Sequence, residues 1–289
     1  MNLPQDKIRL RDGRSLGFLE CGDPEGKPIF YFHGFPGSRL EVQFADKTAS
    51  RQNIRMIGID RPGYGFSDDK QARTFIDWPD DVAELADAIG IDRFSVLGVS
   101  GGGPYAAACA YKQPHRLTSA GIVCGVGPID AVGVLKGMFW INRFGLSFAA
   151  RAPWIIKLAM AAASLALRRH AKITVAFLAG RSKDPDRKEL KRPDIMNILS
   201  ASFKESMRSG PSGASRDVFL YASSWGFDLQ KIRVPIHLWH GEKDDIVPIA
   251  MARYLADTIP NCRASFYRDE GHFSLVVKYM EEILRVLVA

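Results

Sequence analysis

Short apolar runs alternate along the chain with longer stretches in which apolar residues recur at helical spacing. Each run has four to six residues, which is typical of a strand buried on both faces of a parallel sheet. The runs are Ile29–Phe32, Arg55–Ile59, Phe94–Leu97, Ala120–Gly125, Val234–Trp239 and Ala264–Tyr267. Strands that alternate with helices in this way predict an α/β fold, with a mostly parallel central sheet and helices on both faces.

The flanking stretches extend this sheet and cover it. Residues 7–20 alternate loosely around the turn signal Asp12-Gly13, which predicts an antiparallel hairpin. Residues 78–89 carry apolar positions on one helical face and acidic positions elsewhere, and residues 274–287 form a second amphipathic stretch. We expect both stretches to be helices that pack on the sheet.

The pattern changes after Pro128. From about residue 131 to residue 180 the sequence is apolar and helical in character, with scattered basic residues. We expect its apolar side chains at helical spacing to belong to the core; they include Trp140, Phe144, Phe148, Trp154, Ile155, Ile156, Leu158, Met160 and Leu165. A charged link over 181–192 and a mobile loop over 208–215 follow.

This change divides the chain into two predicted parts. Residues 1–127 and 227–289 form the α/β core, and residues 128–226 form a helical cap, or lid, inserted between two of its strands. A helical insertion after the carboxyl end of a strand lies over the site that such a sheet builds there. We therefore expect the inner, apolar face of the cap to line a pocket for the substrate.

The positive charge belongs to the predicted cap. The chain has a formal net charge of +7, but residues 128–226 hold 16 basic against 7 acidic residues, a net of +9. A solvated basic surface is the simplest interpretation, and attraction of an anionic substrate or of an anionic membrane surface is the weaker alternative. No nucleic-acid-binding motif accompanies the charge, so we expect no nucleic-acid partner.

Cysteine and histidine usage indicates neither disulfides nor a metal. The four cysteines, Cys21, Cys109, Cys124 and Cys262, lack the spacing of metal ligands, and buried reduced thiols are the expected state. The six histidines are scattered, and no cofactor fingerprint is present. The first residues lack the apolar stretch of a secretory signal. We expect a cytoplasmic protein without a metal or cofactor.

A glycine-flanked serine marks the candidate nucleophile. In Gly98-Val99-Ser100-Gly101-Gly102 the serine stands between an apolar run and an alanine-rich helical stretch. A strand that passes directly into a helix forces the residue at the turn towards positive φ, and its neighbours must be small. This arrangement predicts a nucleophile elbow, with the Ser100 hydroxyl raised above the sheet.

Other polar loops follow the neighbouring strands. In His33-Gly34-Phe35-Pro36-Gly37-Ser38, backbone amides can face the mouth of the sheet, and we expect those of Phe35 and Gly101 to stabilise an oxyanion. We expect His33 and Gly34 to shape this loop, and Asp60 to hold the loop of residues 60–67 by accepting backbone hydrogen bonds.

A carboxylate and an imidazole complete the candidate chemistry. Asp244 and His272 each follow a predicted strand, so the topology brings them to the same sheet edge as Ser100. Serine needs a neutral imidazole to take its proton, and a carboxylate must orient that imidazole. The order Ser, Asp, His is the one expected for this architecture. Asp245 and Asp130 are the rival acids.

With these motifs the chain resembles the α/β-hydrolase superfamily, in its capped, serine-nucleophile, esterase-like form. The matching segments are 33–37, 60–67, 98–102, 240–248 and 271–272. The resemblance implies Ser100 as nucleophile, His272 as base and Asp244 as acid. It also implies the amides of Phe35 and Gly101 as oxyanion donors.

The resemblance leaves several chemistries open. A serine at the elbow disfavours epoxide hydrolases and haloalkane dehalogenases, and Gly-Val-Ser-Gly-Gly differs from the elbow typical of proline iminopeptidases. The expected function is carboxylic ester hydrolysis on a small-molecule ester or other acyl substrate, by an acyl-enzyme mechanism. The alternatives are carbon–carbon bond hydrolysis, perhydrolysis, and a non-catalytic ligand-binding or regulatory role.

Overall fold

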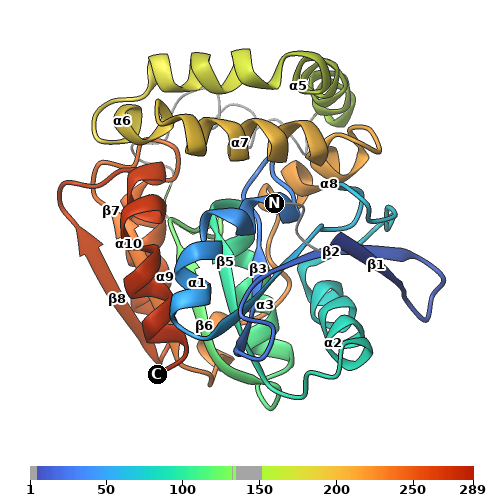
Figure 1. Cartoon of the computed structure of the whole chain (residues 1–289), viewed down its shortest axis with the longest axis vertical. Coiled ribbons are helices and arrows are strands. Elements are labelled where there is room, and N and C mark those ends of the chain that lie inside the picture. Colours follow the sequence, from blue (N-terminus) through green and yellow to red (C-terminus); the bar gives the residue numbers. More distant parts are fainter. Residues whose placement is uncertain (1–4, 132, 135–151) are drawn as a thin grey trace.

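An eight-stranded sheet forms the centre of the computed structural model, which describes residues 5–131, 133–134 and 152–289 (Figure 1). Its strand order is β1-β2-β4-β3-β5-β6-β7-β8. The strands are β1 (Gln5–Arg9), β2 (Ser15–Gly22), β3 (Lys27–Phe32), β4 (Ile54–Ile59), β5 (Phe94–Val99), β6 (Leu117–Val123), β7 (Ile236–Gly241) and β8 (Cys262–Tyr267).

The sheet is mostly parallel. Strands β1 and β2 form an antiparallel hairpin and β2 pairs antiparallel with β4, whereas β4, β3, β5, β6, β7 and β8 run parallel to one another. All six residues of β5 are buried, because helices cover the sheet on both sides. The predicted fold class and the predicted hairpin are confirmed.

Two helical layers cover the sheet. Helices α2 (Trp78–Ala88), α3 (Gly103–Lys112) and α9 (Ile249–Thr258) pack their apolar side chains into one core cluster. The short 3₁₀ helix η1 (Arg39–Phe44) and the helices α1 (Asp46–Arg51) and α10 (His272–Leu287) pack into a second cluster. The amphipathic stretches expected over 78–89 and 274–287 are therefore helices of opposite layers.

A group of helices between β6 and β7 lies beyond one edge of the sheet (Figure 1). Its members are α5 (Pro153–Arg181), α6 (Asp186–Leu190), α7 (Pro193–Ser206) and α8 (Ser212–Tyr221). We call them the α5–α8 segment. They fall within the predicted cap, whose boundaries at residues 128 and 226 stay a prediction.

Two expectations about this segment are wrong. The charged stretch 181–192 is not only a link, because it contains α6 and buries Asp186. The stretch 208–215 is not a mobile loop throughout, since α8 begins at Ser212 and Gly213 packs against the backbone of Gly63. Polar composition by itself excludes neither a helix nor burial, and tertiary contacts order both stretches.

Helix α5 corrects a third expectation. Ile156 and Leu167 are buried, but Trp154 is 67% exposed and Leu158 is 65% exposed, and Ile155 and Leu165 are also exposed. The helix packs on α7 and α8, which leaves its outer face towards solvent (Figure 1). Apolar side chains occur on more than one face of α5, so packing on one side leaves some of them in solvent. Trp140, Phe144 and Phe148 lie outside the described residues.

Within the described part of the chain, no helix has both the length and the apolar character needed to cross a bilayer.

Candidate active site

Ser100 lies at the sharp turn between β5 and α3. Its φ is +53°, a left-handed conformation that is unusual for a residue with a side chain. Gly98 and Gly102 permit the turn, because a Cβ at Gly98 would strike the Gly102 carbonyl and a Cβ at Gly102 would strike that of Phe32. The Ser100 residue is 8% exposed. The backbone thus has the strained strand-to-helix geometry expected of a nucleophile elbow.

Asp244 and His272 form a hydrogen-bonded pair. The Nδ1 atom of His272, the first residue of α10, lies 2.7 Å from Oδ2 of Asp244. The other carboxylate oxygen of Asp244 accepts from the amides of Ile246 and Val247, at 2.9 and 2.8 Å. An ionised carboxylate only accepts hydrogen bonds, so Nδ1 of His272 carries the proton. Nε2 is then left as the acceptor nitrogen, as a general base requires.

The environment of the pair shifts the pKa values of His272 and Asp244 in opposite directions. Burial by itself lowers the pKa of His272, but the Asp244 carboxylate outweighs it, and the pKa is raised above the ordinary 6.5. Burial raises the pKa of Asp244, whereas the positive charge and hydrogen bond of His272 lower it, and the result is a lowered pKa. The pair therefore stabilises a cationic imidazolium beside an ionised carboxylate.

Neither rival acid is hydrogen-bonded to His272, whose Nδ1 pairs with Asp244. Asp245 is half-buried, and burial together with the Asp244 charge raises its pKa. Asp130 is exposed. The structure thus brings Asp244 to the His272 ring.

The loop after β3 passes beside the elbow. A Cβ placed on Gly34 would lie 3.6 Å from Cβ of Ser100, and one placed on Gly101 would lie 3.0 Å from Cβ of Phe35. Gly34 and Phe35 therefore lie directly against Ser100 and Gly101. The two amides predicted as oxyanion donors belong to adjacent residues in space.

His33 and Asp60 each bond to loop backbone. Nε2 of His33 is 3.2 Å from the amide of Arg61, and Nδ1 is 2.9 Å from the Gly34 carbonyl, so the ring is neutral with its proton on Nδ1. Burial and the nearby Arg61 charge hold the pKa of His33 well below its ordinary value. Asp60 is buried and accepts from the amides of Arg39 and Phe66, at 2.8 and 2.9 Å.

Comparison with known families settles the fold family. Residues 27–279 match the family model described as alpha/beta hydrolase fold. The chain belongs to the alpha/beta hydrolase fold family. The resemblance to the α/β-hydrolase superfamily is therefore confirmed.

Individual relatives of this α/β hydrolase have different activities. A proline iminopeptidase of Xylella fastidiosa is 29% identical over 140 residues, which cover 47% of this chain and 40% of that protein. A 2-hydroxymuconate semialdehyde hydrolase of Pseudomonas putida is 25% identical over 310 residues, covering 99% and 96%. A solved esterase from Exiguobacterium antarcticum has a TM-score of 0.72 at 17% identity, covering 98% and 99%.

These matches establish a hydrolase family and not a substrate. The chain spans less than half the length of the iminopeptidase it matches, and the identity to the solved esterase is low enough to show the fold alone. The relatives named include a peptidase, a hydrolase of a semialdehyde and an esterase.

A buried ionic network of this α/β hydrolase was not found from the sequence. Asp217 on α8 is fully buried and pairs with Arg61 at 2.8 Å and Arg73 at 2.7 Å. Arg61 also donates to the Gly34 carbonyl at 3.0 Å, and the Tyr221 hydroxyl donates to the Gly101 carbonyl at 2.9 Å. The network thus joins the α5–α8 segment to the loop that holds Phe35 and to the turn that holds Gly101, the two candidate oxyanion donors. No sequence signal distinguishes Asp217 from a surface aspartate.

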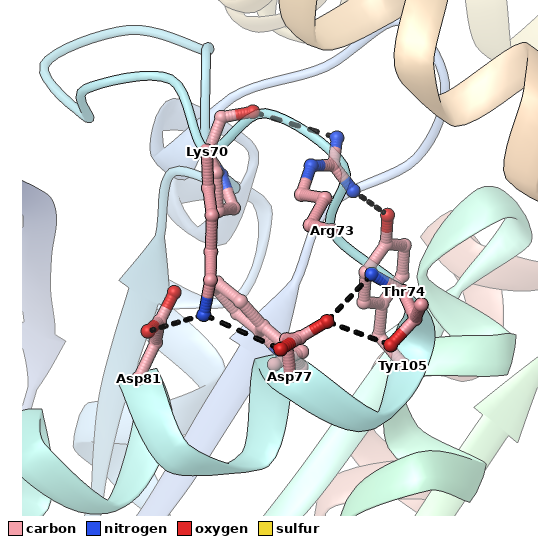
Figure 2. Close-up of a pocket in the computed structure, with 8 residues that line it drawn as sticks. Lys70, Arg73, Thr74, Asp77, Asp81 and Tyr105 are labelled. Atoms are coloured by element: carbon pink, nitrogen blue, oxygen red, sulfur yellow. Dashed lines mark hydrogen bonds and ion pairs between the residues drawn. The ribbon is translucent and has the colours of Figure 1, made fainter.

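A hollow lined in part by Arg73 is not a candidate site. It has no space large enough for a water molecule and is lined by residues of the 62–81 region and by Tyr105. Figure 2 shows that its polar groups pair with one another. Asp77 accepts from Thr74 at 2.7 Å and lies 3.5 Å from the Lys70 ammonium, while Arg73 donates to the Tyr105 hydroxyl. The charged side chains of the hollow are thus engaged with one another. Nε of Arg73 and Nε1 of Trp78 are buried there without a hydrogen-bond partner among the described residues, but the hollow has no room for a ligand.

Glu41 is a second buried carboxylate that the sequence analysis missed. It accepts from the Gly34 amide at 2.9 Å and from the Tyr31 hydroxyl at 3.2 Å. Burial, only partly opposed by these hydrogen bonds and by Arg61, raises the pKa of Glu41 to about 7. A titrating carboxyl therefore lies behind the loop that contacts Ser100.

One group of described residues has metal-binding side chains close together. Ligand atoms of Cys124, Asp244 and His272 lie within 4.8 Å of one another. Burial, reinforced by the Asp244 charge, holds the pKa of the Cys124 thiol well above its ordinary value, so the thiol keeps its proton and is a poor ligand. The hydrogen bond between Asp244 and His272 accounts for the arrangement, and the geometry favours acid–base chemistry over metal binding.

Proposed function

We propose that this chain is a serine hydrolase of carboxylic esters that works through an acyl-enzyme. The observation that carries the proposal is the 2.7 Å bond between His272 and Asp244 at the sheet edge where Ser100 occupies a strained elbow. An oriented, neutral imidazole is what a serine hydroxyl needs in order to attack a carbonyl carbon.

In the proposed mechanism Oγ of Ser100 attacks the ester carbonyl while Nε2 of His272 takes the hydroxyl proton. Asp244 stabilises the imidazolium that forms. The amides of Phe35 and Gly101 donate to the oxyanion. His272 then returns the proton to the departing alcohol, and water, deprotonated by the same imidazole, hydrolyses the acyl-enzyme.

The substrate side of the proposal rests on apolar packing. The Phe35 side chain contacts the cluster formed by Ile156 of α5 and Val218 of α8, together with Met160. The α5–α8 segment thus brings apolar side chains to the candidate oxyanion loop, which supports an apolar acyl or alcohol group. As the proposed cap, residues 128–226 would select the substrate.

The test is turnover of a p-nitrophenyl ester series of increasing acyl length, with fluorophosphonate labelling beside it. We expect Ser100→Ala to abolish both while its circular dichroism stays unchanged. The control is Ser224→Ala, an exposed serine outside the site, which should keep both. Labelling that persists in the Ser100 variant would overturn the assignment, and negligible turnover of every ester would favour a ligand-binding member.

Carbon–carbon bond hydrolysis is the second candidate. It is favoured by the relative from Pseudomonas putida, whose alignment covers 99% of this chain. 2-Hydroxymuconate semialdehyde and a proline anilide belong in the same panel, so that the preferred bond is measured directly. A cytoplasmic location stays a prediction. The four cysteines are free thiols: Cys21, Cys109, Cys124 and Cys262.

A further inference from the structure

The outer face of α5 exposes a group of large apolar side chains. They are between 41% and 67% exposed and comprise Trp154, Ile155, Leu158, Leu165, Ile173 and Phe177. Among the described residues the other large hydrophobic side chain with comparable exposure is Phe266, on β8. Figure 1 shows α5 at the outer edge of the molecule, above α7. The first four precede and the last two follow a kink at His170, where the backbone leaves the helical conformation. A group of exposed apolar side chains of this size marks an interaction surface.

The charge of the same helix is uniformly positive. Residues 153–181 contain five basic residues and no acidic residue. Lys157, Arg168, Arg169 and Lys172 are exposed. The surface therefore combines apolar side chains with cations that have no acidic neighbour along the helix.

A basic hollow lies between α5 and α7. It has a volume of about 570 Å³ and is lined by Leu40, Arg168, Ala201, Lys204, Glu205 and Arg208. Glu205 is the acid among three basic residues there, and it is engaged by Arg39 and Arg208, each at 2.9 Å. The remaining charge of the hollow suits a phosphate group.

We propose that the outer face of α5 docks on an anionic phospholipid surface, with lipid phosphate in the hollow between α5 and α7. Apolar side chains beside basic ones are what a helix lying in a lipid interface requires. A second copy of the chain fits less well, because a symmetric contact through α5 would face five basic residues with five more. The inner face of α5 carries Ile156 and Met160 beside Phe35, so docking turns the proposed cap towards the lipid.

The experiment is co-sedimentation of the full chain with phosphatidylcholine vesicles, with and without phosphatidylserine. We expect binding only when phosphatidylserine is present, and release by salt, which screens the charge attraction. Leu158→Glu with Ile173→Glu changes the apolar face, and Arg168→Glu with Lys204→Glu changes the hollow. Each double variant should weaken binding more than about tenfold. The first loses apolar burial in the lipid interface, and the second reverses two cations that each add to the affinity for an anionic surface.

The matched control variants make the same kinds of charge change at exposed positions outside α5 and the hollow. Phe266→Glu introduces a charge at the exposed apolar side chain of β8, and Lys231→Glu reverses an exposed charge on the core. Both should keep vesicle binding. The two double variants test the proposal independently, so one that failed to fold would leave the other informative.

Three results would overturn the proposal: equal binding to neutral vesicles, vesicle binding that survives both double variants, or no vesicle binding at all. Concentration-dependent dimerisation that the α5 variants abolish, without vesicle binding, would assign the face to a second copy instead. The readout does not depend on hydrolysis. Fluorophosphonate labelling of Ser100 in the same samples keeps failure of the docking proposal distinct from failure of the proposed function.

Discussion

The Asp186 carboxylate lies 2.9 Å from the backbone nitrogen of His272 and accepts its hydrogen bond. The same carboxylate accepts from the next two amides of α10, those of Phe273 and Ser274, at 3.0 and 2.8 Å. Gly271 allows this approach, because a Cβ there would lie 2.6 Å from the Asp186 carboxylate. A buried residue of α6 thus caps the helix whose first residue is the proposed base.

Replacing Asp186 should therefore change both the free energy of unfolding and the pKa of His272. We expect Asp186→Ala to lower the free energy of unfolding by about 1–2 kcal/mol, as loss of a helix N-cap does. The Asp186 charge is among the influences that raise the pKa of His272, after Asp244 and against burial. Removing the charge should lower that pKa, so the acid limb of the kcat/KM profile should move to lower pH.

The matched control for this prediction is Asp269→Ala. Asp269 stands three residues before His272, but it is exposed and paired with Lys243. The Asp186→Asn variant keeps the side-chain shape and loses the charge, so it separates the pKa effect from packing. Identical pH profiles for Asp186→Asn and the wild type would contradict the expected electrostatic contribution.

Asp244→Asn should abolish most of the activity and spare the fold. The amide of Asn can present a donor to Nδ1, which stabilises the wrong tautomer, and the loss expected in kcat is about 10³- to 10⁴-fold. The neighbouring Asp245→Asn should change kcat less than about threefold, because Asp245 does not hold the ring. Steady-state kinetics on the best ester measure both. A large loss in the Asp245 variant alone would transfer the acid role to that residue.

The wild-type pH profile follows from the same pair. Because Asp244 raises the pKa of His272 against the effect of burial, we expect the acid limb of kcat/KM to have its midpoint above 6.5. Activity should fall as the pH drops through that midpoint, since the protonated imidazole cannot accept the serine proton. A midpoint below 6.5 would mean that burial outweighs the carboxylate.

The buried ion pairs of Asp217 with Arg61 and Arg73 should contribute more to the free energy of unfolding than an exposed aspartate–arginine pair does. Asp217→Ala leaves Arg61 and Arg73 buried without their carboxylate, and we expect a loss of about 3–5 kcal/mol in the free energy of unfolding. Asp194→Ala, which removes an exposed partner of Arg192, should cost less than about 1 kcal/mol. Urea unfolding at neutral pH measures both, and similar losses would show that the network is not specially stabilising.

The pH dependence of this contribution has a definite sign. Burial opposes ionisation of Asp217, but Arg61 and Arg73 outweigh it, so its pKa in the folded state is depressed. The unfolded chain binds the proton first as pH falls. The stabilisation is therefore complete above the unfolded pKa of about 3.9, and it is lost as the pH falls from there towards the lower folded value.

Glu41 should show the opposite dependence. Its pKa of about 7 lies above the ordinary 4.5, so the folded state holds a proton that the unfolded chain releases. Stability should therefore decrease as the pH rises from 4.5 to 7. Glu41→Gln removes this titration, and the variant should gain stability relative to the wild type at pH values above 7 and lose that advantage near pH 5. Glu281→Gln, at an exposed position, should show no such crossover.

The sequence was sufficient for features that depend on local pattern and on chain order. Apolar runs identified the parallel strands, and in such a sheet the loops after the strands meet at one edge. The positions of Ser100, Asp244 and His272 in those loops followed from that topology. The strained elbow was also predictable, because the small residues that permit it are neighbours of Ser100 in the chain.

Only the tertiary structure decided the roles of Asp186, Asp217 and Glu41. Each is an acidic residue outside the recognised motifs, and sequence alone gives a buried carboxylate and a solvated one the same appearance. Their partners are distant in sequence: Asp186 stands 86 positions from His272, and Asp217 stands 156 from Arg61. The orientation of α5 was decided in the same way, because its apolar side chains occur on more than one face and do not indicate which face its neighbours will cover.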